Sequence, residues 1–185
     1  MTHSKPLDMS KLKFAARLLL FGAILSAIVI AISGVVSSTR AQKPDAVPDG
    51  WTKISVCHLS FFAPPDLKDL EVRGVDSCVA QYGNDEITVY LDYGRYGSAP
   101  RRNNSYLEFK EQSLLIDRKS GQLTTFLYAG PSPSGGKYIA SIYVVVKEAE
   151  SDVFPKTISL MMSVRGENQK TQEIAQRIFR TIHFD

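Results

Sequence analysis

Apolar and polar residues alternate with a period of two along several short segments of the chain. Residues 86–93 present one apolar and one more polar set, formed by Ile87, Val89, Leu91 and Tyr93 and by Thr88, Tyr90 and Asp92. This alternation predicts a half-buried antiparallel strand. Residues 77–82 are its predicted hairpin partner, because Gly83, Asn84 and Asp85 between the two segments are turn-forming residues.

Other segments are also typical of strands. Residues 54–63 are rich in Val, Leu and Phe and stop at Pro64 and Pro65, which predicts a first strand. Two strands are expected at 114–117 and 123–128, joined by a turn at 119–121. Residues 138–146 have apolar residues on both faces, which predicts a central strand, and residues 157–164 alternate.

Two segments are predicted to be helical. Ser105 and Glu108 have the spacing of a capping box, which predicts a short helix through Gln112. Residues 169–181 are predicted to form a longer helix, with a core-facing stripe made of Ile174, Ala175, Ile178, Phe179 and Ile182. The predicted fold class is therefore α+β, an antiparallel β-sheet flanked by a short helix and a long C-terminal helix.

An N-terminal transmembrane or signal helix is expected to precede this domain. Residues 18–36 carry no charge, and 19 residues can cross a hydrocarbon core of about 30 Å. The basic residues of segment 1–17 favour a cytoplasmic N-terminus. An uncleaved anchor and a cleaved signal peptide both remain open, because Ala41-Gln42 and Ser38-Thr39 are acceptable cleavage sites. Residues 37–50 are the expected linker, and residues 51–185 the exported domain.

The net charge of +3 belongs mainly to this leader. Basic residues outnumber acidic ones before residue 42, where they are Lys5, Lys11, Lys13, Arg17 and Arg40 against Asp8. The rest of the chain has a slight acidic excess. A nucleic-acid-binding domain needs its own positive field, so nucleic acid is not an expected partner.

The chain contains two cysteines, Cys57 and Cys78, and both lie in the exported part. A pair of cysteines in an oxidising compartment most simply forms one disulfide. The alternative is a redox or metal site that includes His58, but no C-x-x-C pair or recognisable ligand set is present. We therefore expect a structural disulfide, no metal site and no cofactor.

Three features together resemble the PsbP-like family, which includes DcrB-type envelope proteins of bacteria. They are the first strand ending in residues 59–64, the late pair of strands at 138–146 and 157–164, and the closing helix that runs into residues 178–184. The resemblance covers residues 51–185. It implies an antiparallel sheet flanked by helices, and a role in binding other proteins rather than in catalysis.

One stretch stands out as a candidate site. Between Asp92 and Glu108 the chain contains no acidic residue and combines tyrosine with arginine, the types enriched at binding hot spots. The residues predicted to form a partner-binding loop are Tyr90, Tyr93, Arg95, Tyr96, Arg101 and Arg102. The alternative is a solvated hairpin loop whose tyrosines half-cover the sheet.

No catalytic residue is assigned, because the sequence contains no G-x-S-x-G, H-E-x-x-H, P-loop or G-x-G-x-x-G motif. The primary hypothesis is a non-catalytic module in the cell envelope, membrane-anchored or secreted, that binds another envelope protein. Two alternatives stay open: a small-ligand carrier, and a hydrolase whose site is assembled from residues distant in sequence.

Overall fold

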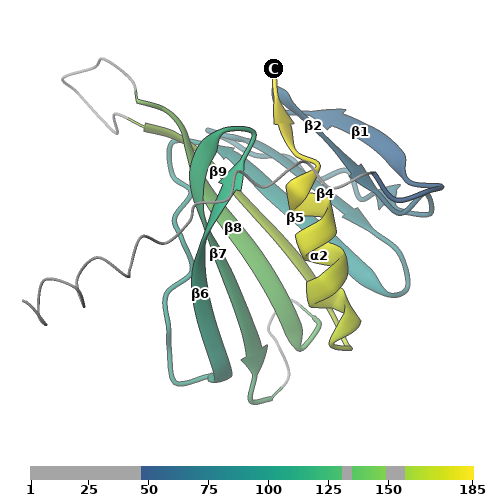
Figure 1. Ribbon diagram of the computed structural model, residues 1–185, viewed down its shortest axis with the longest axis vertical. Helices are drawn as coiled ribbons and strands as arrows, with labels where there is room; N and C mark the ends of the chain where they lie inside the picture. Colours follow the sequence, from purple (N-terminus) through teal and green to yellow (C-terminus); the bar gives the residue numbers. More distant parts are fainter. Residues whose placement is uncertain (1–46, 131–134, 149–156) are drawn as a thin grey trace, which may run out of the picture. The chain divides into compact units, whose positions relative to one another are not determined.

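The computed structural model describes residues 47–130, 135–148 and 157–185, and within these ranges the chain is mostly β. The strands and the helix are β1 (Thr52–Val56), β2 (Leu59–Ala63), β3 (Lys68–Asp69), β4 (Cys78–Gly83), β5 (Ile87–Gly94), β6 (Tyr106–Ile116), β7 (Lys119–Tyr128), β8 (Tyr138–Glu148), β9 (Thr157–Gly166), α2 (Lys170–Arg180) and β10 (His183–Phe184). They form two antiparallel sheets, of order β1-β2-β10 and β3-β4-β5-β9-β8-β7-β6, and one helix (Figure 1). The expected single sheet flanked by two helices is thus only partly confirmed.

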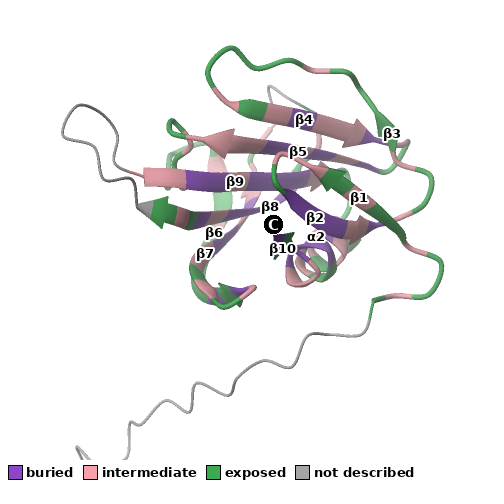
Figure 2. Ribbon diagram, turned by 90° about the horizontal axis from the view of Figure 1, so that it is seen from above, coloured by how far each residue is buried: buried purple, intermediate pink, exposed green. Residues whose placement is uncertain are grey.

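The large sheet buries one of its faces in the core. Val89 pairs with Val164, and Val164 pairs in turn with Ala140, so one row of apolar side chains crosses three strands. The next row consists of Leu91, Met162 and Ile142. All of these side chains are fully buried (Figure 2). The alternation that the sequence indicated in residues 86–93 is confirmed, because Ile87, Val89 and Leu91 point into this core.

The small sheet and α2 cover this face. Phe61 of β2 is fully buried and contacts Tyr82 of β4, with ring centroids 6.3 Å apart. The helix packs on β8 and β9 and also touches β2. Its buried residues include Ala175, Ile178 and Phe179, so the predicted stripe is confirmed. We call the opposite side of the large sheet the second face.

The predicted short helix at residues 105–112 is wrong. Residues 106–112 belong to β6, an 11-residue strand that pairs with β7 from Tyr106 to Ile116. The pairing places Phe109 opposite Phe126, and the rings of Tyr106 and Phe109 stack at 5.7 Å. Pairing with the aromatic strand β7 in a hairpin outweighs the local capping signal, because it brings the rings of Phe109 and Phe126 together on neighbouring strands.

Two tight turns also differ from the expectation. The predicted first strand is divided into β1 and β2 by a turn at Cys57 and His58. The hairpin of β6 and β7 turns at Asp117 and Arg118, not at residues 119–121. All four turn residues have positive φ values, between 43° and 65°. Such turns are commonly made by Gly or Asn, so their sequences contained no turn signal.

The remaining strand predictions are confirmed. β4 and β5 form the expected hairpin, and Asn84 Oδ1 accepts hydrogen bonds from the backbone N–H groups of Glu86 and Ile87 in its turn. β8 and β9 contain the segments 138–146 and 157–164. Within the described part of the chain, no helix is long and apolar enough to span a membrane. The predicted N-region 1–17, the span 18–36 and most of the linker lie outside the described residues.

Candidate functional site

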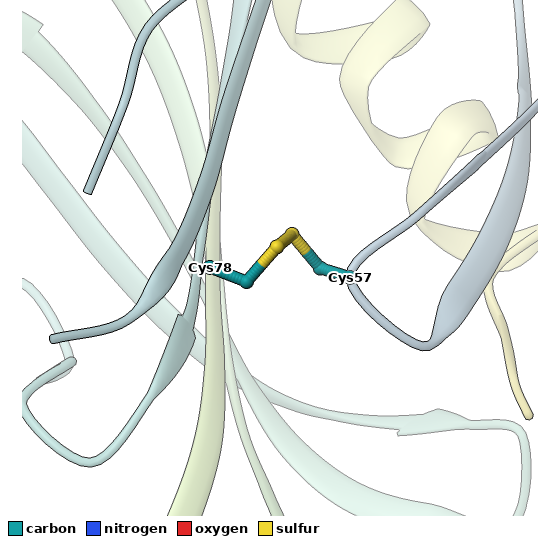
Figure 3. The surroundings of a disulfide bond; sticks show 2 residues. All are labelled: Cys57 and Cys78. Atoms are coloured by element: carbon teal, nitrogen blue, oxygen red, sulfur yellow. A yellow bond between two sulfur atoms is a disulfide. The ribbon is translucent and has the colours of Figure 1, made fainter. Parts of the chain in front are cut away.

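The predicted disulfide is present. Cys57 lies in the turn between β1 and β2, and Cys78 begins β4 (Figure 3). Their sulfur atoms are bonded at 2.02 Å, and their Cα atoms are 5.6 Å apart. The bond therefore joins the small sheet to the large one. A disulfide of this kind is typical of an oxidising, extracytoplasmic compartment.

The structure separates the two tyrosines of the predicted loop that lie in β5. Tyr93 pairs with Cys78 and Leu160 and faces the core side, where its ring lies 6.0 Å from that of His58. Tyr90 points to the second face, in register with Ser163. The two side chains cannot belong to one surface, because neighbouring positions of a strand alternate between faces.

The other four predicted residues lie on the connection between β5 and β6. Arg95, Arg101 and Arg102 are exposed, and Tyr96 is 66% exposed. In Figure 1 this connection runs along the side of the strands away from α2. We call these four residues the Tyr/Arg surface. Among the described residues, no acidic side chain forms an ion pair with any of its three arginines.

The first residues of the β5–β6 connection contact the second face of the large sheet. A Cβ atom at Gly97 would lie 3.3 Å from Ser159 Oγ and 3.4 Å from Met161 Cβ, so this glycine permits a close approach to β9. Ser159 Oγ also donates a hydrogen bond of 3.3 Å to the carbonyl of Gly94. Ala99 and Pro100 are half-buried. The connection that carries the exposed side chains of the Tyr/Arg surface is thus packed against the large sheet near Gly97.

Sequence reasoning missed the polar character of the second face. Ser163, Ser141 and Thr124 form one row across β9, β8 and β7, continuing from Tyr90, and all three are buried. Thr124 Oγ1 and Asp92 Oδ1 have no hydrogen-bond partner within the described ranges. The alternation of β9 indicated which side chains lie on this face, but not that the polar ones among them are buried.

Several tyrosines have a pKa above the usual value, which favours the neutral form of the phenol. Burial raises the pKa of Tyr90, and the nearby carboxylate of Asp92 raises it further, while Arg165 opposes both effects. Burial likewise raises the pKa of Tyr93 and of Tyr106. These phenols stay protonated at neutral pH.

A concave region lies at the end of the core side, and of the six residues of the predicted loop only Tyr93 lines it. It is a groove of about 630 Å³ between the turn of β6 and β7, the adjoining ends of β8 and β9, and β10. Asp117, at its edge, lies 3.1 Å from His183 Nδ1. Its Oδ2 accepts a 2.9 Å hydrogen bond from the backbone N–H of Phe184.

The groove residues come from segments far apart in the chain, so no local motif could have indicated them. Within the described residues, no group of three or more His, Cys, Asp and Glu side chains lies close enough together to hold a metal ion. The disulfide likewise uses the cysteines that the alternative redox or metal site required. No family model and no curated protein sequence matches this chain.

Proposed function

We propose that residues 51–185 form a non-catalytic, extracytoplasmic protein-binding module of the cell envelope, anchored in or released from the membrane. The partner is another envelope protein, bound through the Tyr/Arg surface. One observation carries the proposal: three arginines and one exposed tyrosine occupy a single connection and have no acidic partner among the described residues. Such groups are available to an acidic surface on a second protein.

The contact between the β5–β6 connection and β9 strengthens this proposal. Gly97 sits directly against β9, so part of the connection is ordered before any partner arrives. Ordering a loop in advance lowers the entropic cost of binding. The disulfide is consistent with export. The resemblance to PsbP-like proteins, which mostly bind other proteins, points in the same direction and remains a prediction.

The experiment is cross-linking in intact cells that express the chain with a C-terminal tag. The protein is captured after treatment with an amine-reactive cross-linker, and its companions are identified by mass spectrometry. We expect one envelope protein at near-equal amount with the wild type. The double variant Arg101→Glu/Arg102→Glu should recover at least tenfold less of it, because two charge reversals turn attraction into repulsion.

The matched control is Arg73→Glu/Arg177→Glu. It makes the same change of charge at two exposed arginines outside the Tyr/Arg surface and removes no lysine that the cross-linker needs. We expect wild-type recovery of the partner. Equal recovery by Arg101→Glu/Arg102→Glu and the wild type would refute the proposed surface.

The hydrolase alternative has no structural observation in its favour. Neither His58 nor His183 hydrogen-bonds a hydroxyl or thiol group among the described residues, and His183 instead pairs with Asp117. The small-ligand alternative is favoured by one specific observation, the groove beside Asp117.

A further inference from the structure

The groove beside Asp117 is bounded by three basic side chains from two segments. Arg118 and Lys119 come from the turn and the first residue of β7, and Lys147 comes from the end of β8. Within the described residues, none of the three forms an ion pair. Basic side chains gathered at a concave surface attract an anion when the neighbouring carboxylates do not cancel their charge.

The acidic residues of the groove only partly offset this charge. Asp117 is already engaged, because its carboxylate accepts the N–H of Phe184 and pairs with His183. Asp185 forms no ion pair with another described side chain. The side chains that line the groove therefore include three cations, one engaged carboxylate and one free carboxylate.

Apolar side chains form the rest of the groove lining. Tyr93, Val146 and Ile158 are half-buried, and Phe184 is 9% exposed. Lys119 Nζ lies 5.6 Å from the centroid of the Phe184 ring. This arrangement combines positive charge with apolar and aromatic surface, as expected for a ligand with an anionic group and an apolar body.

The walls of the groove are fixed by contacts between distant segments. The backbone N–H of Asp185 donates to the carbonyl of His58, in the turn that the disulfide links to β4. On the other side, Asp117 fixes the backbone of Phe184. Asp117 and Arg118 have φ values of 43° and 65°, which are unfavourable for residues with a Cβ atom and occur often at functional sites.

We propose that this groove binds a phosphate ester with an apolar body. Arg118 contacts the phosphate through its planar guanidinium, and Lys119 and Lys147 contribute as point charges. Tyr93 and Phe184 contact the body. A soluble phosphate ester and a phospholipid headgroup share this chemistry, and the experiment separates the two sources. This site is distinct from the Tyr/Arg surface, and its test does not depend on the proposed partner.

The experiment titrates the full chain, purified in a neutral detergent and labelled with ¹⁵N. One arm uses phenyl phosphate, and the other uses dihexanoyl phosphatidylglycerol, with dihexanoyl phosphatidylcholine as the zwitterionic comparison. We expect saturable amide shifts at residues 117–119, 147 and 184 in at least one arm. Arg118→Gln/Lys147→Gln should weaken this binding at least tenfold; both positions are exposed, so the fold should persist.

The control is Arg101→Gln/Arg102→Gln, which removes the same charge from the Tyr/Arg surface and should leave the affinity within twofold. Saturation by phenyl phosphate identifies a soluble ester as sufficient, whereas saturation by phosphatidylglycerol alone identifies the lipid as the source. The proposal is overturned if neither probe shifts the groove amides in a saturable way. Equal weakening by the two double variants also overturns it, because binding would then reflect general charge.

Discussion

At the scale of a single residue, Asp117 takes part in three features of the structure. It occupies a turn position with φ of 43°, accepts the backbone N–H of Phe184 and pairs with His183. Burial by itself would raise the pKa of Asp117. The hydrogen bond from Phe184, the pairing with His183 and the charge of Arg118 outweigh burial, so the pKa is lower than usual. The ionised carboxylate therefore stabilises the folded state.

The first prediction concerns acid stability. Because the pKa of Asp117 is lower in the folded state, its contribution is present above the ordinary aspartate pKa of about 3.9 and is lost as the pH falls through the folded value. Asp117→Asn should thus be less stable than the wild type at pH 7. The difference should shrink below about pH 4, as the wild-type carboxyl becomes protonated.

Urea unfolding between pH 7 and pH 2.5 measures this difference. Asp85→Asn, at an exposed acidic residue in the turn before β5, serves as the control and should follow the wild type throughout. A stability difference between Asp117→Asn and the wild type that stays constant over this range would contradict the assigned role.

At the scale of elements, one residue connects the helix to the small sheet. Thr181 follows α2, and its Oγ1 donates a 2.7 Å hydrogen bond to the carbonyl of Ile178. The same oxygen accepts a 2.9 Å hydrogen bond from the backbone N–H of Phe62 in β2. Residues 119 positions apart in the sequence are thereby held together, and the end of the helix is fixed against the small sheet.

The second prediction tests this connection. Thr181→Val keeps the shape of the side chain but leaves the partly buried N–H of Phe62 without its acceptor, which should cost about 1–2 kcal/mol of unfolding free energy. Thr181→Ser retains the hydroxyl and should lose less than half as much. Chemical denaturation of the three proteins provides the measurement. A larger loss in Thr181→Ser than in Thr181→Val would show that packing of the methyl group, rather than the hydrogen bond, matters at this position.

At the scale of the whole domain, the disulfide is the covalent link between the two sheets. It closes a segment with a sequence separation of 21 residues, which includes β2 and β3. The same small sheet reaches the helix through Thr181 and the groove through the contact of His58 with Asp185. Loss of the bond should therefore affect the small sheet and the groove more than the centre of the large sheet.

The third prediction concerns the removal of this disulfide. Cys57→Ala/Cys78→Ala should lower the unfolding free energy by about 3 kcal/mol, the value expected for a loop of this length. Amide hydrogen exchange should accelerate more in β1 and β2 than in β8 and β9, since the large sheet keeps its own ladder of backbone hydrogen bonds. The wild type in reducing agent should behave like the variant. A uniform acceleration over all strands would contradict a local role for the disulfide.

The sequence alone predicted the elements whose buried residues follow a short-range pattern along the chain. Strands β5 and β9 and helix α2 show the periodicity that their position in the core demands, and β8 shows the apolar run of a central strand. The pairing of Cys57 with Cys78 followed from their number, and the exposure of Arg101 and Arg102 agrees with the expected loop. Each of these features depends on residues close together in the chain or on a simple count.

Only the tertiary structure decided the remaining features, because they depend on pairing and contacts that local periodicity does not specify. Residues 106–112 form a strand because they pair with β7 in a hairpin, despite a helix-like local pattern. The turns at Cys57 and Asp117 use positive φ without glycine, and contacts with β4 and with Phe184 support them. The groove likewise exists only where β7, β8 and β10 meet. Local periodicity thus indicated the apolar residues of the core, whereas the tertiary structure determined what they are buried against and which polar residues are buried as well.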